Sequence, residues 1–178
     1  MSRLPLLPDD PADPALKAMF EEVRARGIRV PNLYKIIGHA PQMLRGWLDF
    51  AWPLRLHAKT PRTTRELLIL RGAQISGANY EWVHHVEMAL AAGISQAQID
   101  ALSQWQSSSL FSDSDRAVIR LAEEVTRGPA ASAECIDALK QQGFDQAAIV
   151  ELTLTASFYV CVSRFLLSMD IELEATKP

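Results

Sequence analysis

The sequence has 178 residues, a formal net charge of −3, 48% hydrophobic residues and 22% charged residues. This length is enough to bury the core of one domain, and the composition is ordinary for a soluble globular protein. The small negative charge and the absence of a basic run argue against nucleic acid as a partner.

The first part of the chain predicts an extended arm followed by short helices. Residues before Asp13 are rich in proline and aspartate and lack a sustained apolar stretch, so we expect no signal peptide and a cytoplasmic protein. Asp13 followed by proline is a typical helix start, and the helix should run to about Arg26. Further helices are expected over residues 31–37 and from about residue 41, where Pro53 should kink or end the helix.

Residues 60–93 predict a pair of helices and hold the one cluster of side chains that suggests chemistry. The segment 63–66 has the T-x-x-E pattern of a capping box ahead of an apolar run, which predicts a helix to about Ser76. Gly77 should break this helix. A second helix should follow over residues 79–92 and be closed by the next glycine.

The second helix of this pair separates its side chains into faces when they are plotted at about 100° per residue. The face expected to contact the core consists of Trp82, Val83, Val86, Ala89, Leu90 and Gly93. His84, Glu87 and Ala91 are expected on the solvent side. Glu81 and His85 lie one turn apart at the boundary, where a carboxylate and an imidazole can form a charge-assisted pair.

Glu66 lies in an unusual environment for a carboxylate. Its helix carries four successive apolar residues over 67–70, which cover most of its circumference and predict a buried helix. A buried carboxylate must find a partner or take up a proton. His85 on the neighbouring antiparallel helix is one candidate partner, and Arg71 and Arg164 are others.

The remainder of the chain predicts further helices and no strand. Ser95 with Gln98 forms a capping box, and residues 112–115 cap another helix. The first of these helices should end at about residue 102. Three further helices are expected over residues 112–127, 132–142 and 145–171. Glu151 and Arg164 interrupt the last apolar stretch, which therefore predicts a buried helix rather than a membrane span. The fold class is predicted to be all-α.

Two sequences resemble the carboxymuconolactone decarboxylase family, whose superfamily includes the alkylhydroperoxidase D proteins. They are R-E-L-L-I-L from Arg65 and Y-E-W-x-x-H-x-x-x-A-x-x-A-G from Tyr80, and a weaker resemblance begins at Glu151. The resemblance implies an alkylhydroperoxidase D-like multi-helix bundle that assembles as a homo-oligomer, either a dimer, a trimer or a hexamer. We expect one domain over 1–178, with an N-terminal helical arm (1–58), a central helix pair (60–93) and C-terminal helices (112–171).

The resemblance also assigns positions. Glu66 matches the family glutamate and His85 the family histidine, whereas Ala78 and Glu81 occupy the two cysteine positions of the thiol-dependent branch. Thiol peroxidase chemistry needs a reactive thiolate and usually a resolving partner, so this substitution argues against it. The two cysteines, Cys135 and Cys161, form no C-x-x-C motif and are expected to be free thiols in the core.

A metal site from Glu66, Glu81, His84 and His85 is conceivable but disfavoured. Adjacent histidines point in different directions on a helix, and no third strong ligand is evident. We therefore predict neither a metal nor a cofactor.

The leading hypothesis is a carboxymuconolactone decarboxylase-like lyase that couples proton transfer to loss of CO2 from a small carboxylate or lactone. His85 would be the general acid and base, because imidazole titrates near neutral pH, and Glu66 or Glu81 would orient it. Tyr80 is a candidate substrate contact as well as a packing residue. Arg164 would either bind the substrate carboxylate or pair with a buried acid. The alternatives are a peroxidase-like oxidoreductase and a non-enzymatic oligomeric binding protein, and no membrane partner is expected.

Overall fold

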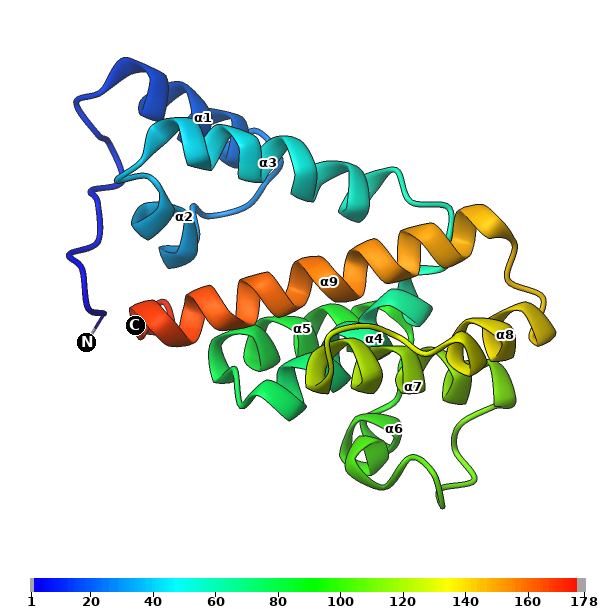
Figure 1. Cartoon of the computed structure of the whole chain (residues 1–178). Helices are drawn as coiled ribbons and strands as arrows, with labels where there is room; N and C mark the ends of the chain where they lie inside the picture. The colour runs from blue at the N-terminus through cyan, green and yellow to red at the C-terminus, as the bar shows by residue number, and fades with distance from the viewer. Residues whose placement is uncertain (1, 176–178) are drawn as a thin grey trace. The chain divides into compact units, whose positions relative to one another are not determined.

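The computed structural model describes residues 2–175, and within that range its secondary structure is entirely helical (Figure 1). The all-α prediction is confirmed. The chain divides into two compact units, one holding residues up to His57 together with those from Leu166 onward, and the other holding Ala58–Phe165.

The first unit contains helices α1 (Pro14–Arg24), α2 (Asn32–Ile37) and α3 (Pro41–Leu56). The Asp13 carboxylate accepts a hydrogen bond from the Leu16 amide at 2.9 Å, which is the helix start that the sequence predicts. Pro53 lies inside α3, and the helix continues for three residues beyond it, so the proline does not end it.

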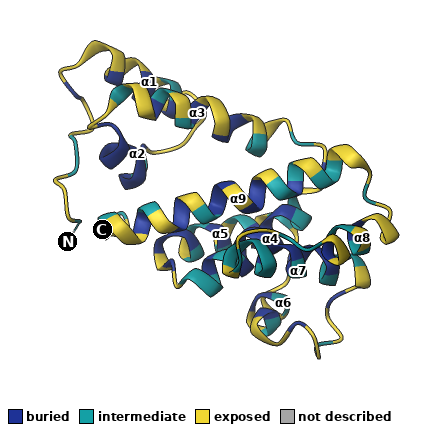
Figure 2. Ribbon diagram, in the orientation of Figure 1, coloured by how far each residue is buried: buried dark blue, intermediate teal, exposed yellow. Residues whose placement is uncertain are grey.

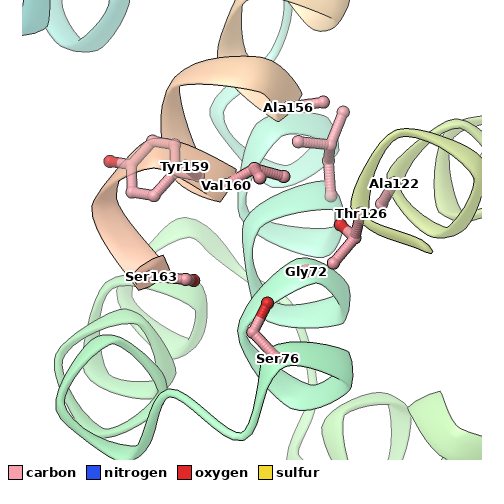
Figure 3. A pocket seen from close by; sticks show the side chains of 9 residues that line it. Gly72, Ser76, Ala122, Thr126, Ala156, Tyr159, Val160 and Ser163 are labelled. Carbon is pink, nitrogen blue, oxygen red and sulfur yellow. The ribbon is translucent and has the colours of Figure 1, made fainter. Parts of the chain in front are cut away.

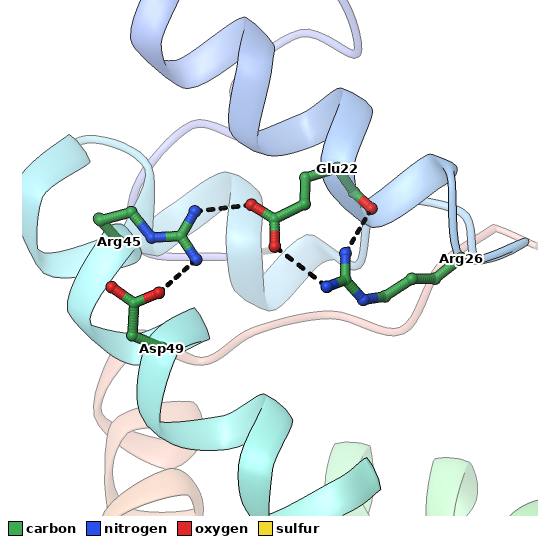
Figure 4. Close-up of polar contacts among 4 residues, drawn as sticks. All are labelled: Glu22, Arg26, Arg45 and Asp49. Carbon is green, nitrogen blue, oxygen red and sulfur yellow. Dashed lines mark hydrogen bonds and ion pairs between the residues drawn. The ribbon is translucent and has the colours of Figure 1, made fainter.

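Partly exposed ion pairs join α1 to α3 within the first unit (Figure 4). The Arg45 guanidinium binds Glu22 and Asp49, each at 2.6 Å, and Arg26 binds Glu22 at 3.2 Å. The hydrogen bond from Arg45 holds the pKa of Glu22 below its usual range. Because such pairs are screened by solvent, they orient the two helices more than they stabilise them.

The second unit is built around helix α4 (Arg62–Ser76), which packs against α5 (Asn79–Ala92) and α7 (Asp113–Arg127). Its buried core draws on α4, α5, α7 and the segment between the last two, including Leu67, Leu70, Ala89, Ile94, Ile99, Leu102, Trp105, Phe111 and Ile119. The remaining elements are α6 (Gln96–Ala101), the short 3-10 helix Leu102–Gln104, α8 (Ala133–Gln141) and α9 (Gln146–Met169). Figure 2 shows the buried residues concentrated along α4 and the inner side of α9.

Two glycines end helices α4 and α5, and the first of them forms the turn between the two helices. Gly77 has a φ of 67° and Gly93 a φ of 101°, in the left-handed region that residues with a Cβ rarely adopt. Both helix ends therefore agree with the sequence prediction. The predicted core-facing side of α5 was too wide. Trp82 and Val86 pack against the core, but Val83 and Leu90 are exposed.

The helix starts show which capping patterns are used. Ser95 with Gln98 and Ser112 with Asp115 form the two predicted capping boxes. The T-x-x-E pattern at Thr63 does not, because α4 already begins at Arg62, directly after a proline, and has no side-chain cap. The Glu66 carboxylate that should complete the box is instead directed at other residues of the second unit.

Helix α9 is long and apolar enough to cross a membrane by length and composition. Within the described residues, 44% of its most apolar stretch is buried. One helix of this kind is weak evidence for a membrane span. The buried positions of α9 include Leu152, Ala156 and Tyr159.

The two kinds of capping pattern predict different costs of mutation. Ser112→Ala should lower the free energy of unfolding by about 1 kcal/mol, because the Asp115 amide loses its acceptor. Thr63→Ala should change it by less than about 0.5 kcal/mol, since this side chain caps nothing. Chemical denaturation of the two variants measures both values, and equal losses would contradict the assignment.

Candidate functional site

A buried hydrogen bond between Glu66 and His85 connects α4 to α5. The His85 Nδ1 atom lies 2.7 Å from Glu66 Oε2. The side chain of Glu66 has no exposed surface, and that of His85 is 4% exposed. Of the three partners that the sequence offered for Glu66, the structure therefore supplies His85.

Arg62 joins this pair from the first turn of α4. Its guanidinium forms an ion pair with Glu66 Oε1, one turn along the same helix, and its Nη2 lies 3.3 Å from the Met88 sulfur on α5. The Arg62 side chain is 33% exposed, in contrast to the buried pair. The Glu66 carboxylate is thus held by a cation on one oxygen and by an imidazole on the other.

The other two arginines considered as partners lie elsewhere. Arg71 is buried but binds Glu123 and Gln74. Arg164 is exposed on α9, and no contact with Glu66, Glu81 or His85 is found within the described chain. The structure therefore does not place Arg164 at the site.

Two residues of α9 complete the surroundings of His85 and Glu81. The buried Tyr159 ring meets the His85 ring edge to face, with centroids 4.9 Å apart and an interplanar angle of 89°. The Ser163 hydroxyl donates a hydrogen bond of 3.0 Å to Glu81 Oε2. Glu81 is 2% exposed and is therefore buried rather than at the predicted boundary.

Tyr80 and His84 form a second aromatic pair on α5. Their rings stack with centroids 4.4 Å apart, and His84 Nδ1 lies 2.7 Å from the Tyr80 carbonyl oxygen one turn earlier. His84 is half-buried, so the prediction of a solvated surface residue was wrong. Stacking on the Tyr80 ring covers part of the His84 ring, and this contact depends on the rotamers of both side chains.

A small hollow adjoins the site between α4, α7 and α9 (Figure 3). Its volume is about 10 Å³, room for about one water molecule, and its lining includes Gly72, Ser76, Thr126, Tyr159 and Ser163. The hydroxyls of Ser76 and Ser163 point toward the space between α4 and α9, whereas the Tyr159 hydroxyl points away from it. Glu66, Glu81 and His85 are not among the residues that line this hollow.

The segment before α4 is fixed by charged side chains. The Glu151 carboxylate accepts hydrogen bonds from the amides of Lys59 (2.9 Å) and Thr60 (2.8 Å). Burial opposes the charged form, but these hydrogen bonds hold the pKa of Glu151 below its usual range. Arg65 is buried and donates to the Thr60 carbonyl, and its desolvation lowers its pKa. The first turn of α4, which carries the site, is thereby held in place.

The cysteines are free, as predicted, but only one of them lies in the core. Cys135 is buried, and its burial raises the pKa of the thiol to about 11. Cys161 is exposed on α9, so its assignment as a core thiol was wrong. An apolar neighbourhood in sequence did not reveal that this side of the helix faces outward.

The site therefore offers acid–base groups rather than a thiol or a metal centre. Ala78 and Glu81 stand at the family's cysteine positions. Within residues 2–175 no three His, Cys, Asp or Glu side chains are grouped to hold a metal ion. Arg62, Tyr159 and Ser163 were missed by the sequence analysis. The four-residue spacing of Arg62 and Glu66 could have indicated the first of them, and the equal spacing of Tyr159 and Ser163 on an apolar helix the other two.

Comparison with known proteins places this geometry in context. Residues 41–124 match the model of the carboxymuconolactone decarboxylase family. No curated protein matches the sequence.

Several solved structures share the fold. A protein from Ralstonia eutropha JMP134, described as an alkylhydroperoxidase AhpD core and an uncharacterized peroxidase-related protein, has a TM-score of 0.81 at 18% identity. The match covers 97% of this chain and 92% of that one. An uncharacterized peroxidase-related protein from Silicibacter sp. TM1040 has a TM-score of 0.80 at 19% identity, covering 98% and 92%. The debrominase Bmp8 has a TM-score of 0.77 at 18% identity, covering 91% and 87%.

The environments of the two thiols predict different reactivities. At pH 8 Cys161 should react with iodoacetamide, while Cys135, whose raised pKa leaves it protonated, should remain unmodified in the folded protein. Peptide mass spectrometry after a short exposure measures both sites. Modification of Cys135 at the same rate as Cys161 would contradict the buried placement, and denaturation should make the two react alike.

Proposed function

Residues 41–124 match the model of the carboxymuconolactone decarboxylase family, and we propose that the chain belongs to this family and is a lyase that removes CO2 from a small carboxylated lactone. The observation that carries the proposal is the buried hydrogen bond between His85 and Glu66. A histidine held by a buried carboxylate is oriented for proton transfer, and its imidazolium form is stabilised.

The proposed step balances without an external electron donor. The bond between the substrate carbon and its carboxylate breaks, its electron pair enters the conjugated system as a dienolate, and CO2 leaves. Protonated His85 then donates a proton to the dienolate, and the neutral imidazole takes up a proton from solvent before the next turnover. Since Nδ1 faces Glu66, the proton is transferred at Nε2. No cofactor is required for this chemistry.

Glu81 has a separate role in this proposal. It occupies a position where thiol-dependent relatives carry cysteine, one helical turn from His85. The hydrogen bond from Ser163 fixes the orientation of its carboxylate. We assign Glu81 to orient His85 or share its proton. Tyr80, stacked on His84, is assigned to packing with a contact to the substrate.

The wider setting follows from the same proposal. We propose that the protein works in the cytoplasm, as a homo-oligomer, on a small-molecule carboxylate or lactone, without nucleic acid or membrane partners. A peroxidase-like oxidoreductase is the second candidate, because two proteins that share the fold are described as peroxidase-related. The residues at Ala78 and Glu81 favour the lyase over a thiol-based reaction.

The lyase proposal predicts that the two adjacent histidines differ in importance. With 4-carboxymuconolactone as substrate, His85→Ala should lower kcat by about 10²- to 10⁴-fold, the usual contribution of a general acid and base. His84→Ala is the matched control and should retain most of the activity. Release of CO2 measures both rates. Equal losses in the two variants, or no CO2 from the wild type, would count against the proposal.

The same site predicts an absence of dithiol-dependent peroxidase activity. No cysteine occupies position 78 or 81. The two cysteines of the chain, Cys135 and Cys161, have 25 residues between them. An organic hydroperoxide with a thiol reductant should therefore not be turned over above the rate without protein. Turnover that persists in the wild type and disappears in Cys161→Ser would contradict this expectation.

A further inference from the structure

Arg62 is the place where the buried Glu66–His85 pair meets the protein surface. Its side chain is 33% exposed, while Glu66 has no exposed surface and His85 has 4%. The guanidinium and the imidazole bind the two oxygens of one carboxylate. The distance between the guanidinium and the imidazole is therefore at most the width of one carboxyl group plus the two contacts to its oxygens. A ligand group bound to the exposed side of the guanidinium would therefore lie close to the His85 ring.

The other arginines near α4 lack this combination of exposure and position. Arg65 is buried and directed toward Thr60, and Arg71 is committed to Glu123. Arg164 is exposed, but no contact joins it to the buried pair within the described chain. Arg62 alone among these four combines an accessible guanidinium with a direct contact to Glu66.

The guanidinium of Arg62 also retains donors for a ligand. Its Nη2 binds Glu66 and lies against the sulfur of Met88, which is a weak acceptor. Within residues 2–175 the Nε and Nη1 atoms have no hydrogen-bond acceptor from the protein. A guanidinium presents five N–H donors in a planar fork that matches the geometry of a carboxylate.

We propose that Arg62 is a specificity-determining residue that binds a carboxylate of the substrate, and that this carboxylate is retained in the product. The inference rests on the proposed function, because it takes His85 as the proton donor. A cation paired with the departing carboxylate would stabilise the substrate and lose that interaction as neutral CO2 forms. Arg62 therefore holds a second acidic group and places the reacting carbon beside His85. Glu66 keeps its contact with one edge of the guanidinium.

The test measures binding rather than turnover. The probes are 5-oxo-2,5-dihydrofuran-2-acetate, which carries one carboxylate on a lactone, and its neutral amide, titrated calorimetrically at pH 7.5. The wild type should bind the acid at least about tenfold more tightly than the amide, because the amide offers no charge to the guanidinium. Arg62→Gln should lose this preference and leave the affinity for the amide unchanged. Arg62→Lys should fall between them, since lysine keeps the charge but not the fork.

Arg164→Gln is the matched control and should behave as the wild type. Equal weakening of both probes in Arg62→Gln would show a structural role for the arginine and overturn the proposal. It would also be overturned by a wild type that binds neither probe or does not distinguish them. The lyase proposal can fail separately: an acid preference that depends on Arg62, without CO2 release, supports the binding site alone. If Arg62→Gln releases CO2 with an unchanged KM, the lyase proposal is supported and the carboxylate-binding role of Arg62 is overturned.

Discussion

The burial of the Glu66 carboxylate is the constraint on which the site depends. Removing a carboxylate from water is costly unless the charge is paired and hydrogen-bonded. Here Arg62 binds one oxygen and His85 the other, at 2.7 Å. The two partners come from α4 and α5, so the spacing of these helices and the rotamer of His85 are fixed together. A shift of either helix would leave a buried charge without part of its compensation.

That constraint in turn requires a rigid start to α4. The helix begins directly after Pro61 and has no side-chain cap of its own. Its stability at this end comes instead from Glu151 on α9, which binds the preceding amides, and from Arg65, which binds the Thr60 carbonyl. The contacts of Glu151 join segments that are far apart in sequence, since Lys59 and Glu151 are separated by 92 positions. Arg62 and Glu66, in the first two turns of this helix, form an ion pair with each other.

The sequence predicts local features of this molecule better than contacts between distant segments. Periodicity and capping residues located the helices, and the break at Gly77 was clear because a left-handed turn needs glycine there. Burial of Glu66 could be inferred from its apolar neighbours. The T-x-x-E pattern at Thr63 was misleading, because the same glutamate has stronger partners in His85 and Arg62 than in a helix terminus.

The remaining site residues depend on how α9 is rotated about its axis, which its sequence hardly indicates. This helix is apolar on most sides, so no hydrophobic stripe distinguishes the face of Tyr159 and Ser163 from that of Cys161 and Arg164. The structure turns the first two inward, against His85 and Glu81, and the latter two outward. The assignment of Arg164 to the substrate stays a prediction, and the structure shows this arginine exposed on α9.

A carboxylate at position 81 changes what this scaffold can do. A thiolate at this place supplies a nucleophile that exchanges electrons, whereas a carboxylate can only accept, donate or orient protons under ordinary conditions. Glu81 is buried and held by Ser163, a small hydroxyl that a cysteine would not need. Glu66 and His85 can serve either chemistry, since both require a histidine to move protons. A carboxylate beside the histidine is therefore consistent with the acid–base chemistry that we propose.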